Sequence, residues 1–160
     1  MNIDIWRKEL WHPVTVHFPL VLLLGATANQ TAAMLADNQN RPAWQTASSI
    51  TLLLGVATAW LSLYTGDLAD GIVARTICDP TELKDHEITA RAMTYTFTVA
   101  AILQQIVRWI ITPRLRRFTN ILVLLILITG TCLLIKAGHL GASVVYQQGG
   151  GVAGYPQDCD

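Results

Sequence analysis

The sequence predicts an all-α fold: an integral membrane bundle of four helices that run alternately up and down. Just over half of the 160 residues are hydrophobic and only 14% are charged, whereas a typical soluble domain has about 25% charged residues. Three apolar runs contain no Asp, Glu, Lys or Arg and span residues 14–36, 44–66 and 118–135. Each is close to the ~20 residues that cross a bilayer, and the last has no polar face of the kind a soluble bundle needs.

The first two helices are expected at residues 13–35 and 44–65, joined by a short polar turn. Pro13 suits a first helical position, and His12 before it is expected to be extended. Pro19 lacks the N–H that would bond the preceding turn, which favours a bend near the mouth of the bundle. These two helices would form the first hairpin.

The third helix is expected at residues 87–111, with Arg91 and Arg108 near its ends, where both side chains can reach the membrane surface. The fourth is expected at 119–137, after a tight basic turn, and the glycine-rich tail 147–160 is expected to be irregular. Residues 1–160 therefore form a single four-helix domain, in which no convincing internal repeat is evident.

The charge distribution predicts the orientation in the membrane. In an up-down-up-down bundle, both termini and the long polar connection 66–87 share one side. That side holds all but one of the eleven acidic residues. The short turns on the other side are dense in arginine, which favours a cytoplasmic location: Arg41, Arg114, Arg116 and Arg117. The sequence thus predicts a bacterial inner-membrane protein with both termini periplasmic and no cleaved signal peptide.

The three cysteines are consistent with this orientation. Cys78 and Cys159 both fall on the predicted outer side, where oxidation can occur, while Cys132 lies within the fourth helix. A Cys78–Cys159 disulfide would tie the tail to the long connection. Two unpaired thiols are the alternative.

The four histidines indicate a candidate cofactor site. All lie near helix ends on the predicted outer side: His12, His17, His86 and His139. An imidazole near lipid is costly and usually has a partner. Four-helix bundles commonly hold cofactors between helices, and haem iron takes imidazole ligands. The sequence therefore predicts one or two haem b groups, with propionates near Arg91.

The pairing of the histidines is left open by the sequence. The preferred first pair is His17 with His86 or His139, and a second haem would use His12. The alternative is that these side chains only cap helices or bond nearby carboxylates, and for His12 taken alone this alternative is favoured. A zinc or copper site is less favoured, because no thiolate or carboxylate shows the close spacing of such sites.

Other polar residues give weaker signals. Asp67 and Asp70 could relay protons but more simply mark a helix end at the interface. Gln104 and Gln105 are expected to join helices rather than to bind quinone. No phosphate-binding loop or nucleophile elbow is present, so no catalytic residue is predicted, and no basic patch supports nucleic-acid binding.

A resemblance to a known family emerges at "WHPVTVHFPLVLL". It resembles the opening of the membrane domain family catalogued as domain-of-unknown-function family 2231. Members typically begin with His-Pro and then Val-His-Phe-Pro, which here are His12, Pro13, Val16, His17, Phe18 and Pro19. The similarity continues through "TGDLAD" and His86. It ends in "GHLGASVVYQQGGGV", which is similar to the family's Gly-x-x-Gly-Gly-x-Leu-Val-Tyr ending.

The chain departs from the family pattern at three positions. Ala142 replaces a glycine, Val144 replaces a leucine, and Gln148 stands where many members have a histidine, whose role His139 could take. The resemblance implies four membrane helices but no established activity. Relatives fused to Rieske-type iron–sulfur domains suggest electron transfer by association.

Three functions are compatible with the sequence. The first is a haem b membrane protein that carries electrons between a periplasmic cytochrome, or another redox subunit, and the membrane. The second is a cofactor-free accessory subunit of a respiratory complex. The third, a metal or small-solute transporter, is least favoured because the middle of the membrane has no ionisable group. A redox carrier or subunit is expected rather than a stand-alone enzyme, with the lipid bilayer as its first partner.

Overall fold

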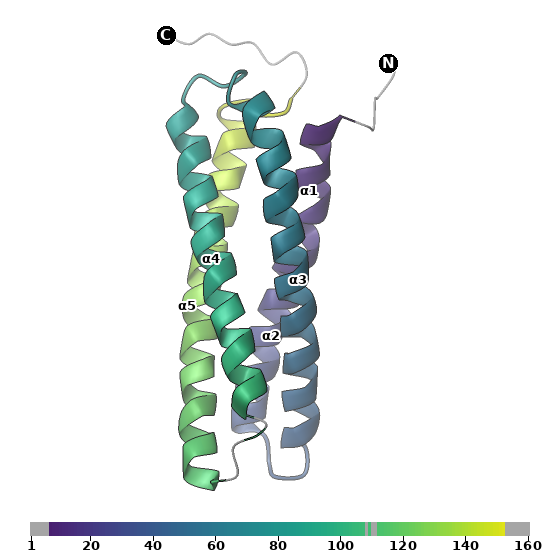
Figure 1. Ribbon diagram of the computed structural model, residues 1–160, viewed down its shortest axis with the longest axis vertical. Helices are drawn as coiled ribbons and strands as arrows, with labels where there is room; N and C mark the ends of the chain where they lie inside the picture. The colour runs from purple at the N-terminus through teal and green to yellow at the C-terminus, as the bar shows by residue number, and fades with distance from the viewer. Residues whose placement is uncertain (1–6, 108, 110–111, 153–160) are drawn as a thin grey trace.

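The computed structural model describes residues 7–107, 109 and 112–152, and in this part of the chain every regular element is helical (Figure 1). The helices run alternately up and down. The α2–α3 and α4–α5 connections lie at one end, and the α3–α4 connection at the other (Figure 1). In order, the elements are η1 (Lys8–Leu10), α1 (Trp11–Thr15), α2 (His17–Leu35), α3 (Arg41–Val73), α4 (Pro80–Val107) and α5 (Pro113–Tyr146).

The bundle exposes many large apolar side chains on its outer surface and buries polar side chains beside an apolar core, as suits a lipid environment. Among the described residues, three segments are long and apolar enough to cross a membrane: Lys8–Leu35, Arg41–Val73 and Pro113–Tyr146. Helix α4, with 28 residues, is as long but less apolar, and it turns Thr89, Thr94 and Gln104 into the interior. The predicted fold class, an integral membrane four-helix bundle, is confirmed.

The helices are longer than the apolar runs that predicted them. Helix α3 continues to Val73 rather than 65, α4 begins at Pro80 rather than 87, and α5 covers Pro113–Tyr146 rather than 119–137. Both α4 and α5 begin with proline, which suits a first helical position. The extensions near the α3–α4 connection pack around a second apolar cluster, formed by Ala69, Val73, Ile77 and Val144.

The first membrane helix is interrupted where the prolines predict. Helix α1 ends at Thr15, Val16 is a turn residue and α2 begins at His17. Pro19 explains the break, because it offers no N–H to the preceding turn. The expectation that His12 is extended was wrong. It is helical in α1, and a hydrogen bond from its ring to α3 holds it there.

The two hairpins are internal repeats of each other, although no repeat is evident in the sequence alone. Gln30 and Gln104 are 74 residues apart and hydrogen-bonded to each other. The same separation relates other buried residues on α2 and α4. The matched pairs are Leu23 with Phe97 and Ala26 with Ala100, all 0% exposed.

On α3 and α5, matched positions are one residue further apart. Gly55 lies against Leu23, where an added Cβ would come within 2.6 Å of a Leu23 methyl carbon. Gly130, its counterpart, lies against Phe97, with 2.9 Å to the ring. Each hairpin therefore closes through a glycine against a large side chain at an equivalent position.

Candidate functional site

Two histidines from opposite hairpins meet near the α3–α4 end of the bundle. His12 on α1 and His86 on α4 are both half-buried, and their ring centroids are 5.9 Å apart with an interplanar angle of 75°. They occupy equivalent positions of the internal repeat. The candidate site is therefore this His12–His86 pair, which lies between the two halves of the protein.

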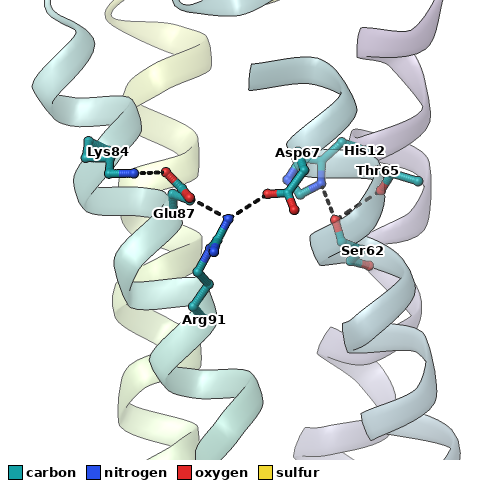
Figure 2. Close-up of polar contacts among 7 residues, drawn as sticks. All are labelled: His12, Ser62, Thr65, Asp67, Lys84, Glu87 and Arg91. Carbon is teal, nitrogen blue, oxygen red and sulfur yellow. Dashed lines mark hydrogen bonds and ion pairs between the residues drawn. The ribbon is translucent and has the colours of Figure 1, made fainter. Parts of the chain in front are cut away.

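Backbone hydrogen bonds fix the orientation of both rings. Nδ1 of His12 lies 2.9 Å from the carbonyl oxygen of Ser62 on α3, as Figure 2 shows. Nδ1 of His86 lies 2.9 Å from the carbonyl oxygen of Ala137 on α5. A carbonyl only accepts, so each Nδ1 carries a proton and donates it. In the neutral ring Nε2 then keeps its lone pair, which is the tautomer that a metal-ligating histidine uses.

Each imidazole also lies against a glycine. An added Cβ at Gly66 would lie 3.2 Å from Cε1 and Nδ1 of His12, and one at Gly141 would lie 3.0 Å from Cε1 of His86. In both hairpins the glycine follows the hydrogen-bonding carbonyl by four residues, one helical turn further on the same face. Each hairpin thus holds its imidazole in the same way. A backbone carbonyl accepts a hydrogen bond from the ring, and a glycine four residues later leaves room for the ring.

Hydroxyl groups surround the His12 side of the site. The carbonyl of Ser62 also accepts a hydrogen bond from Thr65 Oγ1 at 3.0 Å, and Thr65 is bonded to Thr15 at 2.8 Å. Figure 2 shows His12 and Thr65 converging on Ser62. The buried Oγ of Ser62 has no hydrogen-bond partner in the described part of the chain. The residue whose carbonyl holds His12 therefore also has an unused hydroxyl.

An ionic network joins α3 and α4 beside the histidines. Arg91 lies 2.9 Å from Asp67 and 2.7 Å from Glu87, and Lys84 lies 2.6 Å from Glu87. Figure 2 shows the Arg91 guanidinium between the two carboxylates. Arg91, predicted to pair with haem propionates, is thus already held by protein carboxylates. Asp70, interpreted from the sequence together with Asp67 as a helix-end residue rather than a proton relay, is half-buried on α3.

The remaining two histidines face outward. His17 and His139 are exposed, and neither has a hydrogen bond, ion pair or ring contact among the described residues. Ala137 is buried, and two further residues rotate the helix by about 200°, which turns His139 away from the interior. The structure therefore brings together His12 and His86, and not the preferred pair of His17 with His86 or His139.

A short repeated motif could have identified this pair. "HPVT" begins at His12 and "HEIT" begins at His86. Both place a histidine three residues before a threonine, with the same separation that relates Gln30 to Gln104. The motif is only four residues long. It indicates a matched histidine pair only once the two hairpins are known to be equivalent.

The site offers two histidine ligands and no larger ligand set. Within the described ranges, no group of three or more His, Cys, Asp or Glu side chains is arranged to hold a metal ion. Cys132 is free and exposed. Cys78 is disulfide-bonded, and its predicted partner, Cys159, lies outside the described residues, so the Cys78–Cys159 pairing stays a prediction.

The chain belongs to a family described as predicted membrane protein (DUF2231), which matches residues 10–154. This confirms the family that the opening and closing motifs resemble. The match includes both site histidines and both glycines beneath them. No curated protein and no solved structure matches the chain.

Proposed function

We propose that this protein binds one haem b between His12 and His86 and carries electrons at the outer side of the membrane. The observation that supports it best is the pair itself: two imidazoles from opposite hairpins, with Nδ1 of each donating to a backbone carbonyl. The arrangement leaves Nε2 of each ring as the available ligand atom. The carbonyl bonds would also orient the rings and increase their basicity.

The ligand count favours haem over a bare metal ion. Zinc and copper sites usually need three or four protein ligands, and the described residues offer no such group. Haem needs only the two axial ligands, because its own ring supplies the rest. When bound, haem would supply the one-electron chemistry, and His12 and His86 would hold it between the two hairpins. The expected exchange partner is a periplasmic cytochrome or another redox subunit.

A reduced-minus-oxidised absorption spectrum of the purified protein tests this proposal directly. The protein should be made in cells with an ample haem supply and kept folded in mild detergent. A low-spin b-type signal is expected, at about one haem per chain. A folded but colourless protein would refute the proposal and favour the cofactor-free accessory subunit.

We infer that both termini lie in the periplasm of a bacterial inner membrane. The α2–α3 and α4–α5 connections lie at one end of the bundle (Figure 1), and the arginines concentrate there. Reporter fusions at Asn38 and Leu115 should therefore give cytoplasmic signals. A fusion in the α3–α4 connection is the matched control and should give a periplasmic signal. The reverse pattern would invert the orientation.

We expect Cys78 to be linked to Cys159. Cys78 lies in the α3–α4 connection and is disulfide-bonded. Non-reducing peptide mapping of protein recovered from membranes should yield one linked peptide pair, while Cys132 is alkylated freely in unfolded protein without reductant. Free alkylation of Cys78 under the same conditions would contradict this expectation and would also argue against an oxidising location.

A further inference from the structure

A second candidate site lies at the opposite end of the bundle from the histidines. A pocket of about 350 Å³ opens there between helices α2, α3, α4 and α5, within the usual range for ligand pockets of about 300–1,000 Å³. It lies at the end with the two short connections. The side chains that matter most in its wall are Gln30, Gln45, Thr46, Gln104, Arg116 and Asn120.

A network of buried amide side chains determines which atoms of Gln30 and Gln104 donate hydrogen bonds and which accept them. Gln30 donates its Nε2–H to the backbone carbonyl of Asn120, so its Oε1 must accept. Gln104 Nε2 donates to that Oε1 at 3.1 Å and to Ser48 Oγ at 2.9 Å. Ser48 in turn donates to the carbonyl of Ala26. A flipped Gln104 amide would set two acceptor oxygens against each other, so the orientation is determined by its neighbours.

The network leaves one acceptor unused. Gln104 is 6% exposed, and its Oε1 has no hydrogen-bond partner among the described residues. A buried acceptor without a donor is costly, and native structures rarely keep one without a water or ligand. A hydroxyl or N–H donor that reaches Gln104 from the pocket would satisfy this oxygen.

The charge at this end favours an anionic molecule. Arg116 contributes to the pocket, and Arg114 and Arg117 are exposed beside it on the first turns of α5. None of the described residues that line the pocket is a carboxylate. Asp37, the one acidic residue among the described residues of this end, is already bonded to Asn40. Basic pockets between membrane helices on the cytoplasmic side are typical binding places for anionic lipid head groups.

Exposed tryptophans place the pocket at the depth of lipid head groups. Trp44 on the first turn of α3 and Trp109 in the α4–α5 connection are both exposed, Trp109 by 85%. Exposed tryptophan is enriched at the level where head groups meet water. A lipid that lies against the outer faces of α3 and α5 would therefore have its head group beside the pocket.

We propose that this pocket binds the head group of an anionic phospholipid with free hydroxyls, of the phosphatidylglycerol type. The phosphate pairs with Arg116, and a head-group hydroxyl donates to Gln104 Oε1. The zwitterionic lipid phosphatidylcholine lacks both the net charge and the hydroxyl. The proposal rests on the inferred cytoplasmic position of this end of the bundle and on the residues there, and it is independent of haem binding at the other end.

Native mass spectrometry of delipidated full-length protein tests this proposal. Phosphatidylglycerol should be retained about tenfold more strongly than phosphatidylcholine with the same acyl chains, since a charge-assisted hydrogen bond is worth roughly that factor. Arg116→Gln should remove the preference. Arg117→Gln is the matched control because it removes the same charge from the next residue, which does not line the pocket; it should keep most of the preference.

A pocket-blocking variant and a soluble ligand distinguish a lipid in the pocket from surface attraction and from a free phosphate ester. Thr46→Trp, at an exposed position in the pocket wall, should block retention without disturbing the buried amides. Equal losses in Arg116→Gln and Arg117→Gln would overturn the proposal in favour of general surface attraction. Equal retention of both lipids would overturn it as well. Tight binding of free glycerol 3-phosphate without retention of the lipid would show that the ligand is a soluble phosphate ester instead.

Discussion

Replacing His12 or His86 with alanine is expected to remove the low-spin b-type signal of the purified protein. His17→Ala and His139→Ala should leave that signal in place. Mutation of a residue that merely orients a metal ligand typically lowers metal affinity about 10–100-fold, so loss of a ligand itself should cost at least as much. The separation of effects follows from geometry, since His12 and His86 face each other while the other two histidines face outward.

Haem content and spin state distinguish this effect from unfolding. The pyridine haemochrome assay should show at least about tenfold less haem in the His12→Ala, His86→Ala double variant, following the same affinity argument. Circular dichroism should show that the helices remain. Exogenous imidazole should partly restore the low-spin spectrum of either single variant, because truncation leaves space for the free ligand. Full haem retention in both single variants would contradict the pairing.

The internal repeat also predicts that His12→Ala and His86→Ala have similar effects. Each ring is bonded to a carbonyl on the partner helix of its own hairpin and lies against a glycine there. The two single variants should therefore behave alike. A haem that depends on only one of the two would indicate that another residue supplies the second ligand, and His17 or His139 would return as candidates.

Apolar runs were sufficient to predict the helices but not their ends. Hydropathy indicates which residues contact lipid, but it gives no signal for the part of a helix that extends beyond the bilayer. The ends of α3 and α5 depend instead on packing among Ala69, Val73 and Val144, which no local pattern reveals. For this reason His139 lies inside α5 rather than after it.

The end of the bundle at which the histidines lie could be predicted from the sequence, but not which of them face each other. The sequence placed all four histidines at one end, because helix number and direction are enough for that. Which histidine faces the interior depends on helix rotation. His12 was assigned only to a possible second haem, because an imidazole often just satisfies local hydrogen-bonding groups, and it was expected to be extended before proline. A tertiary hydrogen bond to Ser62 overrides that tendency.

Gly130→Ala is expected to lower the stability of the protein markedly. An added Cβ would lie 2.9 Å from Cε2 and Cζ of Phe97, closer than carbon atoms normally approach. The Phe97 ring is 0% exposed and rigid, so it has no free space to move into. Overpacking of this kind typically costs about 1–3 kcal/mol.

Gly138→Ala on the same helix is the matched control. An added Cβ there meets nothing within 4 Å. Alanine should therefore leave the free energy of unfolding unchanged or raise it by up to ~1 kcal/mol through helix propensity. Because Gly130→Ala gains the same propensity, the difference between the two variants isolates the clash. Unfolding by detergent titration, followed by circular dichroism, measures both.

A second substitution, at Phe97, tests whether the contact with this ring causes the loss of stability. Phe97→Leu replaces the rigid ring with the residue type that faces Gly55 in the other hairpin, where the neighbour is Leu23. In the Phe97→Leu background, Gly130→Ala should cost at least ~0.5 kcal/mol less than in the parent, since residues in contact couple by that much or more. An unchanged cost would mean that α5 is sensitive at Gly130 for a reason other than Phe97. The close approach of the two helices would then not depend on this contact.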